Sequence, residues 1–235
     1  MHCCSFSYII KLKKILLISG PKGAVHLKTT AELANSVKIK EYKNGVSILE
    51  KDELLEFIGK GRSAVVFKMK HTNKALKIFF PTCAQIAKEE ADIYRVLEGN
   101  VYFPRLYEAG DNYLVMDYIQ GVTLFDCLAQ GIELNELVIQ QVDKALLSAK
   151  RLGLNPSDIH LKNIILLPEG KIKIIDVARF RQTKDCRQWK DLKKAFFKFY
   201  KKNFFPKKIP VFLLNFIAFL YKKVSFSLPV VYTLF

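Results

Sequence analysis

Residues 155–180, NPSDIHLKNIILLPEGKIKIIDVARF, contain the pattern that decides the fold. Two short apolar runs, 163–167 and 172–175, flank the turn Pro168-Glu169-Gly170. Apolar runs of this length on either side of a Pro/Gly turn predict a small β-hairpin. The hairpin is framed by a polar loop before it and a carboxylate after it.

Three polar side chains sit at the ends of this hairpin. Asp158 and Asn163 lie five residues apart in the loop that leads into the first strand, and Asp176 follows the second strand. A carboxylate can orient or accept a hydroxyl proton. Carboxylate and amide oxygens are also the ligands that Mg²⁺ takes in proteins. The segment therefore predicts an acid–base group beside a magnesium site.

A glycine pair occurs upstream, in IGKGRSAVVFK at residues 58–68. Gly59 and Gly61 separate two β-like runs, and glycine lets backbone amides approach a polyphosphate closely. No Gly-Lys-Ser/Thr follows, so the segment is not a Walker loop. A strand rather than a helix comes next, which excludes a Rossmann fingerprint.

A lysine lies in the next β-like run, ALKIFF at residues 75–80. Lys77 has apolar neighbours on both sides, and a lysine in such a place needs a partner if it is buried. Glu90, or else Glu89, on the helix predicted to follow can supply that partner. An edge-strand lysine that points to solvent is the alternative.

Taken in order, these segments resemble the signature of the protein-kinase family: glycine loop, strand lysine, helix glutamate, Asp with Asn five later, and Asp after a hairpin strand. The resemblance covers about residues 50–195 and includes a hinge-like segment, YLVMDYIQG, at 113–121. The match is closest to small bacterial Ser/Thr-kinase-like proteins, and the segments also resemble RIO kinases and lipopolysaccharide-core sugar kinases.

The resemblance implies an α+β, two-lobed protein-kinase-like fold with a reduced helical C-lobe. We expect an N-terminal extension at 1–35 without clear organisation. An ATP-binding N-lobe of β-sheet and one helix is expected at 36–120, and a helical C-lobe that carries the catalytic loop at 121–235.

The resemblance also implies a role for individual residues. Asp158 would be the catalytic base, Asn163 and Asp176 would ligate Mg²⁺, and Lys77 would contact the phosphates of ATP while pairing with Glu90. The implied nucleotide contacts are Gly59, Lys60, Gly61, Ala64, Val66, Lys77, Met116, Asp117 and Tyr118. ATP and Mg²⁺ are thus the expected cofactors, and Asp191 would brace the catalytic loop.

The chain departs from the protein-kinase pattern around the catalytic loop. Pro156-Ser157 replaces the usual His-Arg, Asp176-Val177-Ala178 replaces Asp-Phe-Gly, and no Ala-Pro-Glu motif follows. His160 stands where Ser/Thr kinases carry Lys. A histidine at this position is typical of aminoglycoside, choline and sugar-lipid kinases. Lys162 could instead supply charge near the γ-phosphate. The hydroxyl acceptor, protein or small molecule, is therefore left open.

Composition sets the remaining expectations. The 235 residues carry a net charge of +16, with a basic stretch at 179–208. This charge favours anionic partners: a solvated basic face is one interpretation, and an anionic membrane surface docked by the C-terminal helices is another. No base-reading motif supports nucleic-acid binding.

The five cysteines are irregularly spaced and suit a reducing cytoplasm, with peripheral membrane attachment as the alternative location. No signal peptide or spanning segment is expected. The apolar stretch 209–221 is interpreted as a buried helix, with interfacial contact as the alternative.

Three functions follow from these observations. A Ser/Thr protein kinase fits the glycine loop and hinge, and a small-molecule, sugar or lipid kinase fits His160. A non-catalytic, membrane-associated binding module fits the basic C-terminal helices and Cys3-Cys4.

Overall fold

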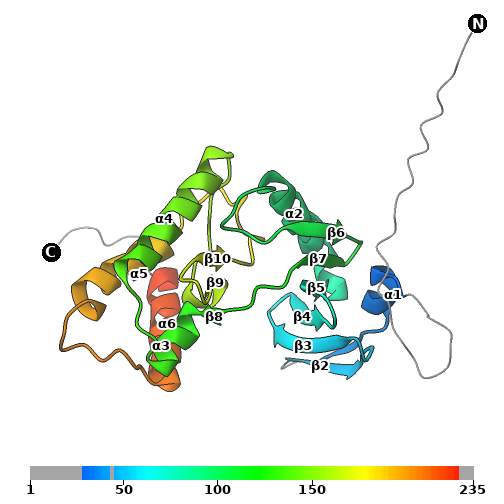
Figure 1. The fold of residues 1–235 in the computed structure, drawn as a ribbon, viewed down its shortest axis with the longest axis horizontal. Coiled ribbons are helices and arrows are strands. Elements are labelled where there is room, and N and C mark those ends of the chain that lie inside the picture. Colours follow the sequence, from blue (N-terminus) through cyan, green and yellow to red (C-terminus); the bar gives the residue numbers. More distant parts are fainter. Residues whose placement is uncertain (1–27, 43–44, 228–235) are drawn as a thin grey trace, which may run out of the picture. The chain divides into compact units, whose positions relative to one another are not determined.

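The structure, a computed structural model, describes residues 28–42 and 45–227 (Figure 1). The chain forms two compact units. The first runs to Ala87 and takes in Tyr107–Met116, and the second comprises Lys88–Leu106 and the chain from Asp117 on. The predicted α+β class is confirmed by this mixture of sheets and helices. The lobe limits at 36–120 and 121–235 stay predictions.

The first unit is built on a five-stranded sheet with the order β3-β4-β5-β7-β6 (Figure 1). A separate two-stranded antiparallel sheet precedes it. The short 3-10 helix η1 (Pro81–Cys83) follows β5. The strands are β1 (Lys38–Tyr42), β2 (Gly45–Glu50), β3 (Leu55–Lys60), β4 (Ala64–Met69), β5 (Lys74–Phe79), β6 (Leu106–Ala109) and β7 (Tyr113–Asp117).

One face of this sheet carries the hydrophobic core of the first unit. Because side chains alternate along a strand, Val65, Phe67 and Met69 of β4 point to the same face. All three are buried, with Leu76 and Ile78 of β5 in the same cluster. Val66, between two of the core residues, is only partly buried. The opposite face is therefore partly exposed along β4, whereas Lys77 and Phe79 of β5 on the same face are buried.

A short helix, α1 (Thr30–Asn35), corrects the expectation that residues 1–35 have no organisation. The Thr29 side chain accepts a hydrogen bond from the Glu32 backbone, and the Glu32 side chain accepts one from the Thr29 backbone at 2.6 Å. This capping box satisfies two N–H groups at the helix start. Leu33 is fully buried in the core cluster, so α1 belongs to the first unit.

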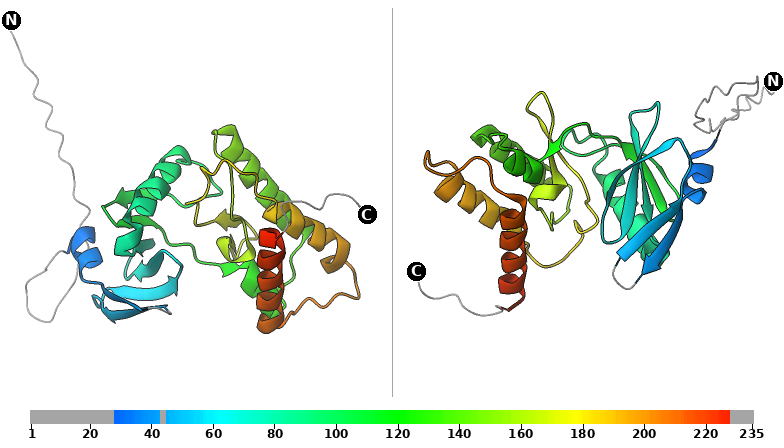
Figure 2. Two further views of the ribbon diagram at one scale, coloured as in Figure 1. Left: turned by 180° about the vertical axis from the view of Figure 1, so that it is seen from behind. Right: turned by 90° about the horizontal axis from the view of Figure 1, so that it is seen from below.

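Helices dominate the second unit, which also contains the three-stranded sheet β10-β9-β8 (Figure 2). The elements are α2 (Ala84–Val96, whose first residues belong to the first unit), β8 (Val122–Thr123), α3 (Leu124–Gln130), α4 (Glu136–Arg151), η2 (Leu161–Asn163), β9 (Ile164–Leu166), β10 (Ile172–Ile174), α5 (Gln188–Ala195), the π-helical turn η3 (Phe196–Tyr200) and α6 (Val211–Ser227).

The predicted hairpin is confirmed, because β9 and β10 pair antiparallel, with Ile164 opposite Ile174. The helix before it, α4, ends at a glycine: Gly153 has φ 78°, and the Leu154 N–H donates to the Ala149 carbonyl at 3.2 Å. This pattern is a Schellman C-cap, which needs a residue that tolerates positive φ.

The last helices contact α4 and each other through polar side chains. The Trp189 indole N–H of α5 donates to Asp143 of α4 at 2.8 Å, and the Tyr221 hydroxyl of α6 donates to Asp191 of α5 at 2.9 Å. The prediction that 209–221 is a buried helix is wrong, because Leu214 is the one α6 side chain classed as buried among residues 211–221. None of the helices formed by the described residues has the length and apolar character needed to cross a membrane.

Candidate active site

Two of the predicted site residues, Asp158 and Asp176, have the same unusual backbone conformation. Both have φ 60°, in the left-handed region. Within the described residues, one other non-glycine residue has a positive φ, His71 in the turn between β4 and β5. Such strain persists only where the surrounding structure fixes it, and it clusters at functional sites. The hairpin β9–β10 thus holds one strained carboxylate before it and one after it.

Asn163 joins these two positions. Its side-chain Nδ2 donates to the Asp158 carbonyl at 3.2 Å, and its own carbonyl accepts from the Ile175 N–H at 2.9 Å. Asn163 is buried, and these bonds fix its amide. The structure therefore brings Asp158, Asn163 and Asp176 together around the hairpin, as their sequence positions predict.

Arg179 is a residue of this cluster that the sequence analysis did not identify. Its Nε lies 3.6 Å from Asp158 Oδ2, and both side chains are partly exposed. An arginine near an exposed carboxylate contributes little to stability. Its place beside Asp158 makes it a fixed positive charge at the candidate site. Its position three residues after Asp176 was the available signal.

Asn155 is a second residue that the sequence analysis missed. Its N–H donates to the Phe180 carbonyl at 2.7 Å, and its side-chain Nδ2 donates to the carbonyls of Gln182 and Lys184 at 2.7 and 3.2 Å. These bonds tie the segment after Asp176 to the start of the loop that carries Asp158.

Other singled-out residues have more local roles in the structure. The His160 carbonyl accepts from the Asn163 N–H at 2.9 Å. The Lys162 Nζ lies 4.2 Å from the centre of the Phe125 ring of α3, a cation–π contact. Asp191 accepts its hydrogen bond from Tyr221.

Helix α2 adds a buried acid and a buried phenol to the same unit. Glu90 is fully buried, and Tyr94, one turn later, is nearly so. Burial raises the pKa of the Tyr94 hydroxyl well above its usual range, and the carboxylates of Glu90 and Asp176 raise it further. The Asp176 backbone lies beside this hydroxyl, which has no partner of hydrogen-bond geometry in the described part of the chain. α2 therefore approaches the strained Asp176.

The first unit aligns three predicted nucleotide contacts across its sheet. Gly59 of β3 is opposite Val66 of β4, and Val66 is opposite Lys77 of β5. This row lies on the face opposite the core, because Val66 alternates with the core residues Val65 and Phe67. Lys77 is buried, and its Nζ lies 5.0 Å from the centre of the Phe79 ring. Lys77 and Glu90 fall in different units, so their pairing stays a prediction.

The glycine loop leaves open space where a side chain would be. A Cβ built on Gly59 meets no atom within 4 Å, and one on Gly61 meets only the Ala64 carbonyl, at 3.6 Å. The Gly61 N–H donates to that carbonyl at 2.8 Å, which closes the turn. Lys60 Nζ donates to the Val46 carbonyl at 3.1 Å. Packing within the chain therefore does not require glycine at 59, whereas a close ligand would.

The hinge-like residues are held by the backbone of Arg105. The Asp117 N–H donates to the Arg105 carbonyl at 3.0 Å, and the Arg105 N–H donates to Asp117 Oδ2 at 2.8 Å. Met116 is buried at the end of β7, and Tyr118 is half-buried. Asp117 is therefore fixed in orientation by these two bonds.

The oxygens of this cluster suit a hard divalent cation. In proteins Mg²⁺ is held by one or two carboxylates plus water and substrate phosphates. Asp176 supplies a carboxylate, and Asn163, whose side-chain nitrogen is engaged, supplies an amide oxygen. Among the described residues, no three His, Cys, Asp or Glu side chains are grouped to hold a metal without such help. The residues present thus fit an ion that arrives with a phosphate ligand.

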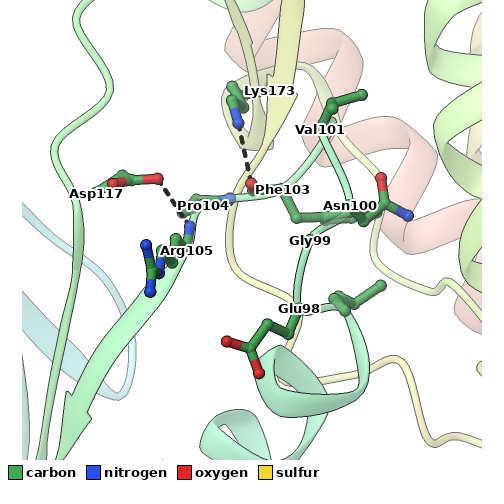
Figure 3. A pocket seen from close by; sticks show the side chains of 10 residues that line it. Glu98, Gly99, Asn100, Val101, Phe103, Pro104, Arg105, Asp117 and Lys173 are labelled. Carbon is green, nitrogen blue, oxygen red and sulfur yellow. Dashed lines mark hydrogen bonds between the residues drawn. The ribbon is translucent and has the colours of Figure 1, made fainter.

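A cavity of about 290 Å³ lies in the second unit, apart from this cluster (Figure 3). Lys173 Nζ donates to the Phe103 carbonyl at 3.0 Å beside it, and burial lowers the pKa of this lysine. Of the predicted site residues it includes Asp117. The side chains that line it include Glu98, Asn100, Phe103, Arg105, Asp117 and Lys173.

Comparison with known proteins gives one matching family. Residues 69–206 match the ABC1 atypical kinase-like domain. The matched range contains Lys77, Glu90, Asp158, Asn163 and Asp176. The glycines at 59 and 61 lie before it.

Two curated proteins are similar to the chain. One from Bacillus subtilis (strain 168), named "Putative serine/threonine-protein kinase YrzF", is 50% identical over 198 residues, which are 83% of this chain and 92% of that protein. One from Clostridium perfringens (strain 13 / Type A), named "Probable serine/threonine-protein kinase CPE1738", is 30% identical over 143 residues. That match covers 53% of this chain and 21% of the clostridial protein.

Proposed function

Because the chain belongs to the ABC1 atypical kinase-like family, we propose that it transfers the γ-phosphate of ATP to a hydroxyl group with the help of Mg²⁺. One observation carries the proposal. Asp158 and Asp176, which lie before and after the β9–β10 hairpin, both hold left-handed backbone conformations and are joined through Asn163. The strain favours a catalytic role over a structural one.

The chain's own residues divide the work as follows. Asp158 orients and accepts the proton of the attacking hydroxyl, and Arg179 places positive charge beside it. Asp176 and Asn163 hold Mg²⁺, which neutralises charge on the phosphates when it is bound with ATP. Lys77 contacts the α- and β-phosphates and pairs with Glu90. The burial of both side chains supports this pairing, because a buried charge needs a partner.

The nucleotide would lie on the free face of the first unit's sheet. The row Gly59–Val66–Lys77 supplies backbone amides for phosphates, an apolar contact for the base, and an ammonium. Gly61, Lys60 and Ala64 complete the loop over the phosphates, and Met116, Asp117 and Tyr118 line the adenine side.

We propose a serine or threonine of a protein as the acceptor. The names of both curated relatives support this choice. A small-molecule hydroxyl is the second candidate. It is supported by His160, by the absence of an Ala-Pro-Glu motif, and by the few residues between Asp176 and the start of α5 at Gln188. The described cysteines Cys83, Cys127 and Cys186 are free thiols, which supports action in a reducing cytoplasm.

The proposal is tested by following labelled phosphate from ATP into a protein pool and a pool of small hydroxyl compounds, with and without Mg²⁺. Asp176→Asn is expected to lower transfer at least about a hundredfold, since it removes the carboxylate that holds the metal. Asp185→Asn is the matched control, because it makes the same change at an exposed position of the same segment.

The outcomes separate the alternatives. Transfer to protein alone supports the kinase of serine or threonine, and transfer to small hydroxyl compounds alone supports the second candidate. Transfer that survives Asp176→Asn contradicts the assignment of Asp176, and no Mg-dependent transfer by the wild type to either pool contradicts the proposed phosphotransferase function.

A further inference from the structure

Helix α6 exposes an apolar surface that the fold of the second unit does not use. Phe212 and Phe216 are 75% and 55% exposed. Isolated exposed apolar residues are ordinary, but a contiguous set marks a surface that meets another apolar phase. The exposed apolar residues of α6, which we call the α6 surface, are Val211, Phe212, Leu213, Phe216, Ile217, Phe219 and Leu220.

The α6 surface is held in place by a few contacts on one side of the helix. The Ile209 N–H donates to the Leu128 carbonyl of α3 at 2.8 Å, and Tyr221 donates to Asp191 of α5 at 2.9 Å. Leu214 packs inward. These contacts hold the start of the helix and its turn at Tyr221 against the second unit (Figures 1 and 2), so the exposed side chains between them are presented on a supported helix.

Exposed lysines lie on the element that contacts α6. Lys190, Lys194 and Lys198 recur every fourth residue through α5 and η3, and all three are exposed. Asp191, which accepts the hydrogen bond of Tyr221 of α6, lies between the first two of them in sequence. The turn of α5 that carries Lys190 and Lys194 is thus the turn that contacts α6, which places positive charge next to this part of the apolar helix.

From this juxtaposition we propose that α6 binds the surface of an anionic lipid bilayer, with its phenylalanines at the acyl–headgroup boundary and the lysines on the headgroups. Exposed apolar side chains on α6 supply apolar burial at the acyl–headgroup boundary, and each lysine of the neighbouring element that comes near such a surface adds about 1 kcal/mol. A second copy of the chain fits less well, because each copy carries a charge of +16 and the two would repel. This inference does not depend on phosphoryl transfer.

The experiment is sedimentation of the full chain with vesicles, in the absence of nucleotide. Vesicles of phosphatidylcholine are compared with vesicles that also contain phosphatidylglycerol, at low and high salt. The wild type is expected to bind the anionic vesicles and to bind them less at high salt. Phe212→Ser with Phe216→Ser is expected to lower the partition constant at least about tenfold, because two phenyl groups lose their apolar environment.

Matched controls separate binding through the α6 surface from non-specific adsorption to the vesicles. Leu137→Ser with Leu147→Ser removes two exposed apolar side chains from α4 of the same unit and is expected to leave binding unchanged. Lys194→Glu with Lys198→Glu is expected to weaken binding about tenfold or more, whereas Lys144→Glu with Lys171→Glu, at exposed positions elsewhere, makes the same charge change with a smaller effect.

Circular dichroism of every variant checks folding, which exposed substitutions should preserve. The proposal is overturned if the wild type ignores anionic vesicles, or if the α4 variant loses binding as the α6 variant does. A concentration-dependent dimer in light scattering that the two α6 substitutions abolish, without vesicle binding, would assign the α6 surface to a second copy instead.

Discussion

Asp158 and Asp176 concentrate backbone strain at the positions where chemistry is proposed. A left-handed conformation costs an L-residue about 1–2 kcal/mol, and Asp tolerates it better than most. The hairpin hydrogen bonds through Asn163 hold the chain in this arrangement. The gain is orientation: a carboxylate on a strained backbone is aimed before any ligand arrives.

Substitution of Asp176 separates this strain from function. Asp176→Gly removes the carboxylate and also the Cβ that disfavours φ 60°, whereas Asp176→Ala keeps the Cβ. We expect the glycine variant to be more stable than the alanine variant by about 1 kcal/mol in urea unfolding. Both should lose Mg-dependent nucleotide binding. Equal free energies of unfolding would show that the left-handed conformation of residue 176 does not lower stability.

The Tyr94 hydroxyl makes a second prediction for a single residue. It is buried and has no hydrogen-bond partner within the described chain. Tyr94→Phe should therefore leave the free energy of unfolding unchanged or raise it by about 1 kcal/mol, because no bond is lost. Tyr113→Phe is the control. Its hydroxyl donates to Glu108 at 2.7 Å, so the same change there should destabilise. A loss of stability in Tyr94→Phe as large as in the control would reveal an unseen partner.

Among the elements, the hairpin of β3 and β4 leaves open space at its glycine, where a nucleotide is proposed to bind. A register shift interrupts the pairing between Phe57 and Gly59, and the space beside Gly59 is open. A bulge next to a glycine bends the strand and re-aims the loop that follows. The strands thereby hold the loop in place while the space beside Gly59 stays free of side chains.

Gly59→Ala tests this shape. The new methyl group meets no atom of the chain within 4 Å, so stability should be unchanged or higher by about 0.5 kcal/mol. Nucleotide affinity, measured by titration calorimetry, should fall because the methyl group occupies the space of a phosphate. Gly121→Ala should behave in the opposite way, since its Cβ would lie 2.4 Å from the Leu166 carbonyl. Unchanged nucleotide affinity in Gly59→Ala would remove Gly59 from the site.

On the scale of the whole molecule, the site residues are divided between two compact units. Lys77 and the glycine loop belong to the first, and Asp158, Asn163 and Asp176 belong to the second. A ligand that binds the folded chain and not the unfolded chain stabilises it by mass action. Stability in the presence of nucleotide is therefore a measurement of nucleotide binding.

We expect Mg-ATP at about a hundred times its Kd to stabilise the chain by about 2.7 kcal/mol. The measurement is the rise in Tm with ligand concentration, in Mg²⁺ and in EDTA. In Asp176→Asn the rise should no longer depend on Mg²⁺, while Asp185→Asn should behave as the wild type. A Tm that does not respond to Mg-ATP in the wild type argues for a chain that has lost nucleotide binding.

Much of the local structure followed from sequence. The β9–β10 hairpin and the strands on either side of the glycine pair were predicted, because apolar spacing and turn residues act between near neighbours. The capping box at Thr29 and Glu32 was a readable signal that the sequence analysis overlooked. α1 has too few apolar residues to show a periodic pattern.

The order and type of the residues were enough to predict the family, the α+β class and the polar residues that meet around the β9–β10 hairpin. The contact of Arg179 with Asp158, the bonds of Asn155 to the segment after Asp176 and the exposure of α6 came only from the packing of the fold. The physical reason is distance along the chain: an apolar helix carries the same pattern whether protein or another phase covers it, and only the packing of remote elements distinguishes the two.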